Sequence, residues 1–289
     1  MARLKTVRDA GEWIVHAIEA QRWLDKPSQK IEHAVALVFN LLGAAGKPAQ
    51  GLLHGTWLGH PLHPLLTDLP VGAWTTALVL DGVDAVAPDA KGFRDAAQLA
   101  VGVGVVGGAG AAVAGLTDWQ YTHDNARRAG LVHGALNAAA LGLYAMSWRD
   151  RRRGRQARGR LLSTVGFGAA TCSAYLGGTL VYPHRVGVDH ADEHLEPRDF
   201  VPVLAADALE EDVPRRMPYG EGWVYRDAIV CPWHGSQFDL PSGLPVRGPA
   251  TAPLPCFETR VRDGQVEVRR VPPVRSADPG AVLGAGGSR

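Results

Sequence analysis

Four stretches of the chain are nearly free of charged residues and long enough to be considered as membrane-spanning helices. A bilayer core is crossed by about 20 apolar helical residues. Asp68 interrupts the first stretch, so it is the weakest of the four. A soluble four-helix bundle is the alternative, but its helices would show a polar stripe. The pattern predicts an α-helical membrane bundle with four transmembrane helices within residues 61–185, at 65–80, 96–117, 131–148 and 161–182.

Residues 1–60 have a different pattern, in which apolar residues recur at helical spacing among charged ones. Two such runs lie on either side of Pro27 and Ser28. The spacing predicts two amphipathic helices. Their charges prevent them from crossing a bilayer, and no signal-peptide pattern is present. We expect them to lie on the membrane surface.

The C-terminal part is polar, with short apolar runs. Residues 186–218 are rich in Asp, Glu, Pro and Arg and are interpreted as a linker that contains one possible strand near 200–204. The region 219–271 is predicted to be a small all-β domain, and the Pro, Ala, Gly and Ser of 272–289 indicate a disordered tail. Asp263-Gly264 is typical of a hairpin turn. The expected strands are 223–225, 228–230, 256–261 and 265–268.

Composition narrows the possible functions. The formal net charge is only +1 over 289 residues, and no basic cluster favours nucleic acid as a partner. The mean hydropathy of −0.05 averages an apolar middle with polar ends. The 35 glycines favour close packing of membrane helices. Three cysteines are too few for a disulfide framework.

One short motif combines a thiol and an imidazole at metal-binding spacing. It is Cys231-Pro232-Trp233-His234-Gly235-Ser236-Gln237-Phe238. This string resembles the second ligand box of a Rieske iron-sulfur domain. The resemblance implies that Cys231 and His234 bind a 2Fe-2S cluster and that Ser236 hydrogen-bonds a cluster sulfur. In that family two Cys hold one iron and two His hold the other.

The first ligand box of that family, a Cys-x-His motif upstream, is absent from the chain. Residues 209–220, where it is expected, contain neither Cys nor His. The sequence therefore supplies half of the usual ligands. Cys256, a linker histidine, a partner subunit or a second copy of the chain remain as sources of the others.

The apolar region resembles an uncharacterised family of small bacterial membrane proteins. Members often carry a C-terminal Rieske domain, so this resemblance implies the architecture but no activity. The motifs that carry it are His60-Pro61-Leu62-His63-Pro64-Leu65, Asp68-Leu69-Pro70, Thr117-Asp118-Trp119, His133-Gly134-Ala135-Leu136-Asn137 and Tyr182-Pro183-His184-Arg185-Val186-Gly187-Val188.

Histidines recur near one end of the expected spans. One hypothesis is that His60, His63 and His133 bind a b-type haem or another metal. The alternative is that they hydrogen-bond between helices. Under either hypothesis Asn137 lies four residues after His133 and can orient its ring.

These patterns predict a multi-pass protein of the bacterial cytoplasmic membrane. The arginines of 149–160 indicate that their loop faces the cytoplasm, although Arg127, Arg128 and Arg185 lie on the opposite face. The expected function is Rieske-type electron transfer to a redox partner protein or a quinone, as a redox component rather than an enzyme with its own substrate pocket. The alternative is a structural or partner-binding membrane protein with a vestigial Rieske domain. A homo-oligomer is compatible with both functions.

Overall fold

The computed structural model describes two compact units, Met1–Asp189 and His190–Arg289. The described residues are 2–87, 91–188, 197, 199–208, 223–225, 228–231, 235–240, 242–251, 253–254 and 256–271. Most of the expected linker and the whole expected tail, 272–289, lie outside them.

The first unit begins with three helices joined by short 3-10 turns. Two were expected, and the break between them was placed wrongly. Pro27 lies in the first turn of the second helix, where a backbone N–H has no helical partner, so proline is tolerated there. The short third helix was not predicted. The helices are α1 (Ala2–Glu19), α2 (Asp25–Leu41) and α3 (Gly46–His54).

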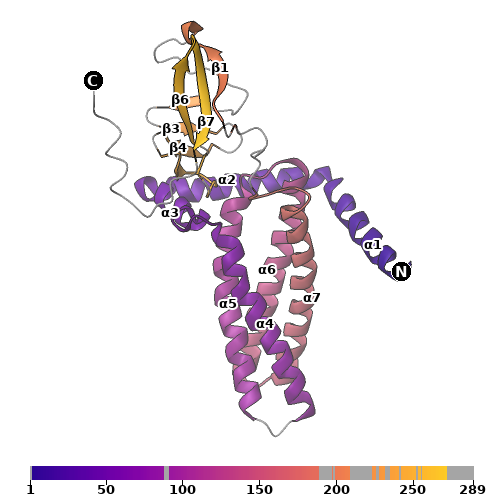
Figure 1. Ribbon diagram of the computed structural model, residues 1–289. Coiled ribbons are helices and arrows are strands. Elements are labelled where there is room, and N and C mark those ends of the chain that lie inside the picture. Colours follow the sequence, from indigo (N-terminus) through magenta and orange to yellow (C-terminus); the bar gives the residue numbers. More distant parts are fainter. Residues whose placement is uncertain are drawn as a thin grey trace. The chain divides into compact units, whose positions relative to one another are not determined.

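Ion pairs join α1 and α2 to one end of the helical bundle, and α2 lies across that end (Figure 1). Arg128 donates to both carboxylate oxygens of Asp25 at 2.7 and 2.9 Å. This guanidinium holds the pKa of Asp25 below its usual range. Arg127 contacts Glu32 at 2.7 Å. Several large apolar side chains of the N-terminal region are exposed, namely Trp13, Trp23, Leu37, Leu41 and Trp57. Such exposure is typical of helices at a membrane surface.

Four long helices form the bundle of the first unit (Figure 1). Within the described residues, α4, α5 and α6 are long and apolar enough to cross a membrane. The expected fourth span, residues 161–182, forms a helix but does not reach that hydropathy, because its uncharged run is rich in Gly, Ala, Ser and Thr. The bounds are α4 (Leu62–Val86), α5 (Lys91–Trp119), α6 (Asp124–Arg152) and α7 (Gln156–Val181).

The centre of the bundle is aromatic. Trp74 of α4 stacks on Tyr144 of α6 with 3.9 Å between ring centroids and 5° between planes. Ala77 and Val101 complete this buried core. Gly104 of α5 allows the close packing, since a Cβ there would lie 2.2 Å from the Trp74 ring nitrogen.

The opposite end of the bundle is held by buried charges. Arg151 of α6 is 2% exposed and donates to both oxygens of Asp81 on α4, at 2.8 and 2.5 Å. It also donates to the hydroxyls of Ser147 and Ser163 at 3.1 and 2.9 Å. The fully buried Asp150 forms ion pairs with Arg155 and Arg158. These contacts connect α4, α6 and α7.

The second unit contains two small antiparallel sheets, with strand orders β1-β7-β6 and β2-β3-β4-β5. The Asp263-Gly264 turn joins β6 to β7, and both residues have positive φ, as a tight hairpin requires. The three-residue strands β4 and β5 were not predicted. The bounds are β1 (Val201–Ala205), β2 (Trp223–Tyr225), β3 (Ala228–Val230), β4 (Gln237–Asp239), β5 (Pro245–Arg247), β6 (Cys256–Arg262) and β7 (Gln265–Val271).

Replacing Arg151 by Ala should destabilise the membrane unit by about 3–5 kcal/mol, because Asp81 is left as a buried charge without its main partner. Denaturant unfolding of the detergent-solubilised protein, followed by tryptophan fluorescence, measures the change. Arg153→Ala, at an exposed position two residues away, is the matched control. Equal losses in the two variants would contradict this role of Arg151.

Candidate functional site

The Cys231–Ser236 box forms a closed loop between β3 and β4. The Cys231 N–H donates to the Ser236 carbonyl at 2.8 Å, and the Gly235 N–H donates to the Cys231 carbonyl at 3.0 Å. Gly235 has φ +68°, a conformation that favours glycine. The loop fixes the backbone on either side of the Cys231 thiol. His234 lies outside the described residues.

Ser236 anchors this loop to the segment that follows β5. Its side chain is buried, and the Ala250 N–H donates to its Oγ at 3.2 Å. The Ser236 hydroxyl proton can therefore be donated to a further acceptor, such as a sulfur. Gly248 has φ +97°, and a Cβ there would lie 2.6 Å from the Ser236 Cα. Glycine at 248 is thus required both by its backbone conformation and by the close approach of Ser236.

A second turn braces the strand that leaves the loop. Asp239, the last residue of β4, accepts from the Ser242 amide and hydroxyl at 2.9 and 2.5 Å. These two hydrogen bonds hold the pKa of Asp239 below its usual range, and the one from the Ser242 hydroxyl has the larger effect. The carboxylate therefore stabilises the turn at neutral pH and loses this contribution as the pH falls through its lowered pKa.

The ligand set of this unit is half of what a Rieske cluster requires. The sequence contains no Cys-x-His motif, and its other cysteines are Cys172 of α7 and Cys256 of β6. Across the described part of the chain, no group of three or more His, Cys, Asp or Glu side chains is placed to hold a metal. The Cys231 box alone would therefore supply two of the four ligands of a 2Fe-2S cluster.

The histidines of the bundle are brought together only in part. His63 of α4 and His133 of α6 meet edge to face, with 6.4 Å between ring centroids. Asn137 donates to His133 Nε2 at 3.1 Å, as the four-residue spacing indicated. His60 is exposed before α4, and its Nδ1 lies 3.0 Å from the Pro61 carbonyl. It takes no part in the described His63–His133 contact.

The sequence did not indicate a buried pair between α3 and α5. His54 is 1% exposed, and its Nδ1 lies 2.6 Å from an Asp118 carboxylate oxygen. Its Nε2 is buried and has no hydrogen-bond partner among the residues that the structure describes. The two residues are 64 positions apart, so no local pattern could have paired them. The family motif Thr117-Asp118-Trp119 was the one available signal.

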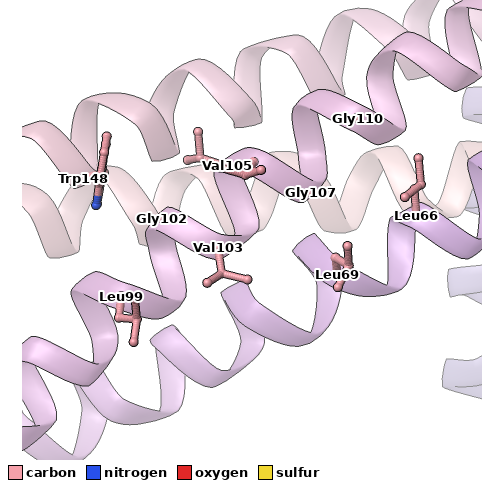
Figure 2. A pocket seen from close by; sticks show the side chains of 10 residues that line it. Leu66, Leu69, Leu99, Gly102, Val103, Val105, Gly107, Gly110 and Trp148 are labelled. Carbon is pink, nitrogen blue, oxygen red and sulfur yellow. The ribbon is translucent and has the colours of Figure 1, made fainter.

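An apolar groove of about 570 Å³ runs along α4 and α5 (Figure 2). Trp148 of α6 closes one end of it. Its lining contains no ionisable or metal-binding side chain, so the groove offers no chemistry of its own. The lining residues are Leu66, Leu69, Leu99, Gly102, Val103, Val105, Val106, Gly107, Gly110 and Trp148.

Residues 215–258 match the Rieske 2Fe-2S domain. Residues 59–190 match the family described as predicted membrane protein (DUF2231). The expected fusion of a membrane family with a Rieske segment is confirmed, as is the expected helical region followed by a small β unit. The Rieske match implies a 2Fe-2S cluster.

Two curated relatives each match 48 residues of this chain. Ferredoxin CarAc of Metapseudomonas resinovorans is 44% identical over 48 residues, which is 17% of this chain and 45% of that protein. The anthranilate 1,2-dioxygenase ferredoxin subunit of Burkholderia cepacia is 40% identical over 48 residues, again 17% of this chain and 44% of that protein. The chain thus spans less than half the length of these relatives. No solved structure gave a significant match.

Gly248→Ala should destabilise the Rieske segment by about 1–3 kcal/mol, because the new Cβ would overlap the Ser236 backbone and the positive φ would be strained. Gly264→Ala, in the β6–β7 turn, is the control: it carries the same strain at φ +74° but meets nothing within 4 Å. Thermal unfolding should show the larger loss in Gly248→Ala. Equal losses would show that the Ser236 contact adds nothing.

Proposed function

We propose that this chain is a membrane-anchored Rieske-type electron-transfer protein. One observation carries the proposal: Cys231 leaves β3 in a closed loop that returns at the buried Ser236, within a segment that matches the Rieske family. Loops of this kind present a thiolate at a fixed position. The two ferredoxins that match the same segment support a role in passing electrons to a protein partner.

Cys231 and His234 are proposed as one half of the ligand set, with Ser236 as a hydrogen-bond donor to sulfur. The other half must come from outside the chain's own Rieske box. A second copy of the chain would supply a further Cys and His, which completes the two-Cys, two-His set of the family. A partner protein is the other source.

The membrane unit is proposed to anchor this segment in the bacterial cytoplasmic membrane. The arginine-rich end of the bundle, at Arg149–Arg160, would face the cytoplasm. If α7 crosses the membrane together with α4, α5 and α6, the start of α4 and the end of α7 both lie on the opposite side of the membrane. A membrane quinone or a redox protein on that side would then be within reach as electron partner.

A non-redox function is the second candidate, and the missing Cys-x-His box favours it. In that case the closed loop is a structural remnant and the bundle serves as a partner-binding membrane protein. The two candidates differ in the iron and sulfide that the purified chain contains.

Anaerobically purified full-length protein should contain iron and acid-labile sulfide and should show a Rieske-type EPR signal after reduction. Cys231→Ala and His234→Ala should each abolish this signal, because each removes one of the few donors available. Thermal unfolding of the two variants shows whether the fold persists.

The ratio of iron to chain separates the sources of the missing ligands. One iron per chain in a dimer, that is one cluster per two chains, supports a second copy as donor. Protein that is free of iron and sulfide after reconstitution with both, when it is purified alone and when it is purified with its bound partner proteins, would overturn the electron-transfer proposal and leave the non-redox function.

A further inference from the structure

The four helices of the bundle form two equivalent hairpins, α4–α5 and α6–α7. Four of the five buried positions of the first helix recur as buried positions in the third at an offset of 70 residues, and Asp84 is the exception. Five buried positions of the second helix recur as buried positions in the fourth at an offset of 62. The buried pairs are Pro70 with Ala140, Trp74 with Tyr144, Ala77 with Ser147, Asp81 with Arg151, Ala97 with Gly159, Val101 with Ser163, Gly104 with Gly166, Ala111 with Ser173 and Ala114 with Leu176.

Equivalent residues of the two hairpins touch each other at three levels. Trp74 stacks on Tyr144, and Asp81 pairs with Arg151. The third level is His63 with His133, which are also 70 residues apart. Equivalent residues can meet in this way only near a shared axis, so the bundle has an approximate two-fold axis along its length. Membrane proteins built from repeats commonly bind ligands at the interface between the repeats.

The two histidines have the same surroundings. His63 Nδ1 lies 2.8 Å from the Ala111 carbonyl on α5, and His133 Nδ1 lies 2.8 Å from the Ser173 carbonyl on α7. A carbonyl only accepts hydrogen bonds, so in each neutral ring the proton is on Nδ1 and the lone pair is on Nε2. The Asn137 amide, which donates to His133 Nε2, agrees with this assignment.

A glycine one turn after each carbonyl makes room for the ring. A Cβ at Gly115 would lie 2.7 Å from the His63 ring, and a Cβ at Gly177 would lie 3.1 Å from the His133 ring. Both hairpins therefore keep an imidazole, a carbonyl that fixes its Nδ1 proton, and a glycine beside it. Histidines that bind metals are typically oriented by such an Nδ1–H bond.

We propose that His63 and His133 together bind one transition-metal centre. Metal–nitrogen bonds of about 2.0 Å allow two imidazoles that share a metal to have centroids up to roughly 6–6.5 Å apart. The observed 6.4 Å is within this reach, and because the rings meet edge to face, a ring must turn for both Nε2 atoms to face the metal. The Asn137 hydrogen bond to Nε2 would be displaced on binding.

The chemistry of the pair defines the ligand class. Two neutral imidazoles suit a metal that imidazole prefers, such as copper or iron. No third protein ligand is placed nearby among the described residues. The centre is therefore either a two-coordinate free ion or the iron of a haem, whose ring supplies the remaining ligands. This site is independent of Cys231 and of the proposed Rieske function.

The experiment uses full-length protein carrying Cys231→Ala, so that iron in the C-terminal unit does not contribute. His63→Asn and His133→Asn keep a side-chain N–H near the Nδ1 position but remove the Nε2 lone pair. The fold should persist while the metal is lost. His60→Asn is the control, because His60 is exposed and lies outside the pair.

Elemental analysis and a pyridine haemochrome assay on the purified protein distinguish a free ion from a haem. The same assays are made on protein incubated with cuprous ion or with haemin, because a bound metal can be lost during purification. We expect about one centre per chain in the parent and in His60→Asn, and at least a tenfold lower content in each Asn variant of the pair. Equal content in all variants would overturn the proposal. So would the absence of copper, iron and haem from the loaded parent, provided that thermal unfolding shows it folded.

Discussion

The pairing of charges without water is the constraint on which the membrane unit depends. A buried guanidinium or carboxylate is costly unless a partner and further hydrogen bonds compensate it. Arg151 has such partners from two other helices, Asp81 on α4 and Ser163 on α7. At the other end Arg128 meets Asp25 of α2. Each ion pair joins segments that are distant in sequence, so the charges determine which helices meet at each end of the bundle.

Small residues determine how closely the helices approach between those ends. Trp74 and Tyr144 stack because Gly104 and Gly166 leave space beside their rings. Lipid removes the usual hydrophobic drive for helix association, so packing and interhelical hydrogen bonds must replace it. The two hairpins pack in the same way: in each, a large side chain on the first helix lies against a glycine on the second. The same repetition places two histidines edge to face.

The sequence predicted the elements whose signal is local. Long uncharged runs indicated α4 to α7, and Asp263-Gly264 indicated the β6–β7 hairpin. Strands β4 and β5 were missed because three residues are too few to show alternation. The exposed break before α2 was misplaced because Pro27 was read as a helix breaker and not as a first-turn residue. The contact of His54 with Asp118 depends on tertiary packing, and no periodicity within either helix contains that information.

The two proposed ligand sets differ in completeness, and the fold gives a reason. In the bundle, the repeat within one chain supplies both members of the His63–His133 pair. In the second unit the one Cys231 box of the sequence would supply Cys231 and His234. Cys256 begins β6 in the β1-β7-β6 sheet, whereas Cys231 follows β3 in the other sheet. Association of two copies would bring two Cys231 boxes together, as the repeat in the bundle brings two histidines together. Two boxes would supply the two Cys and two His that the Rieske family uses.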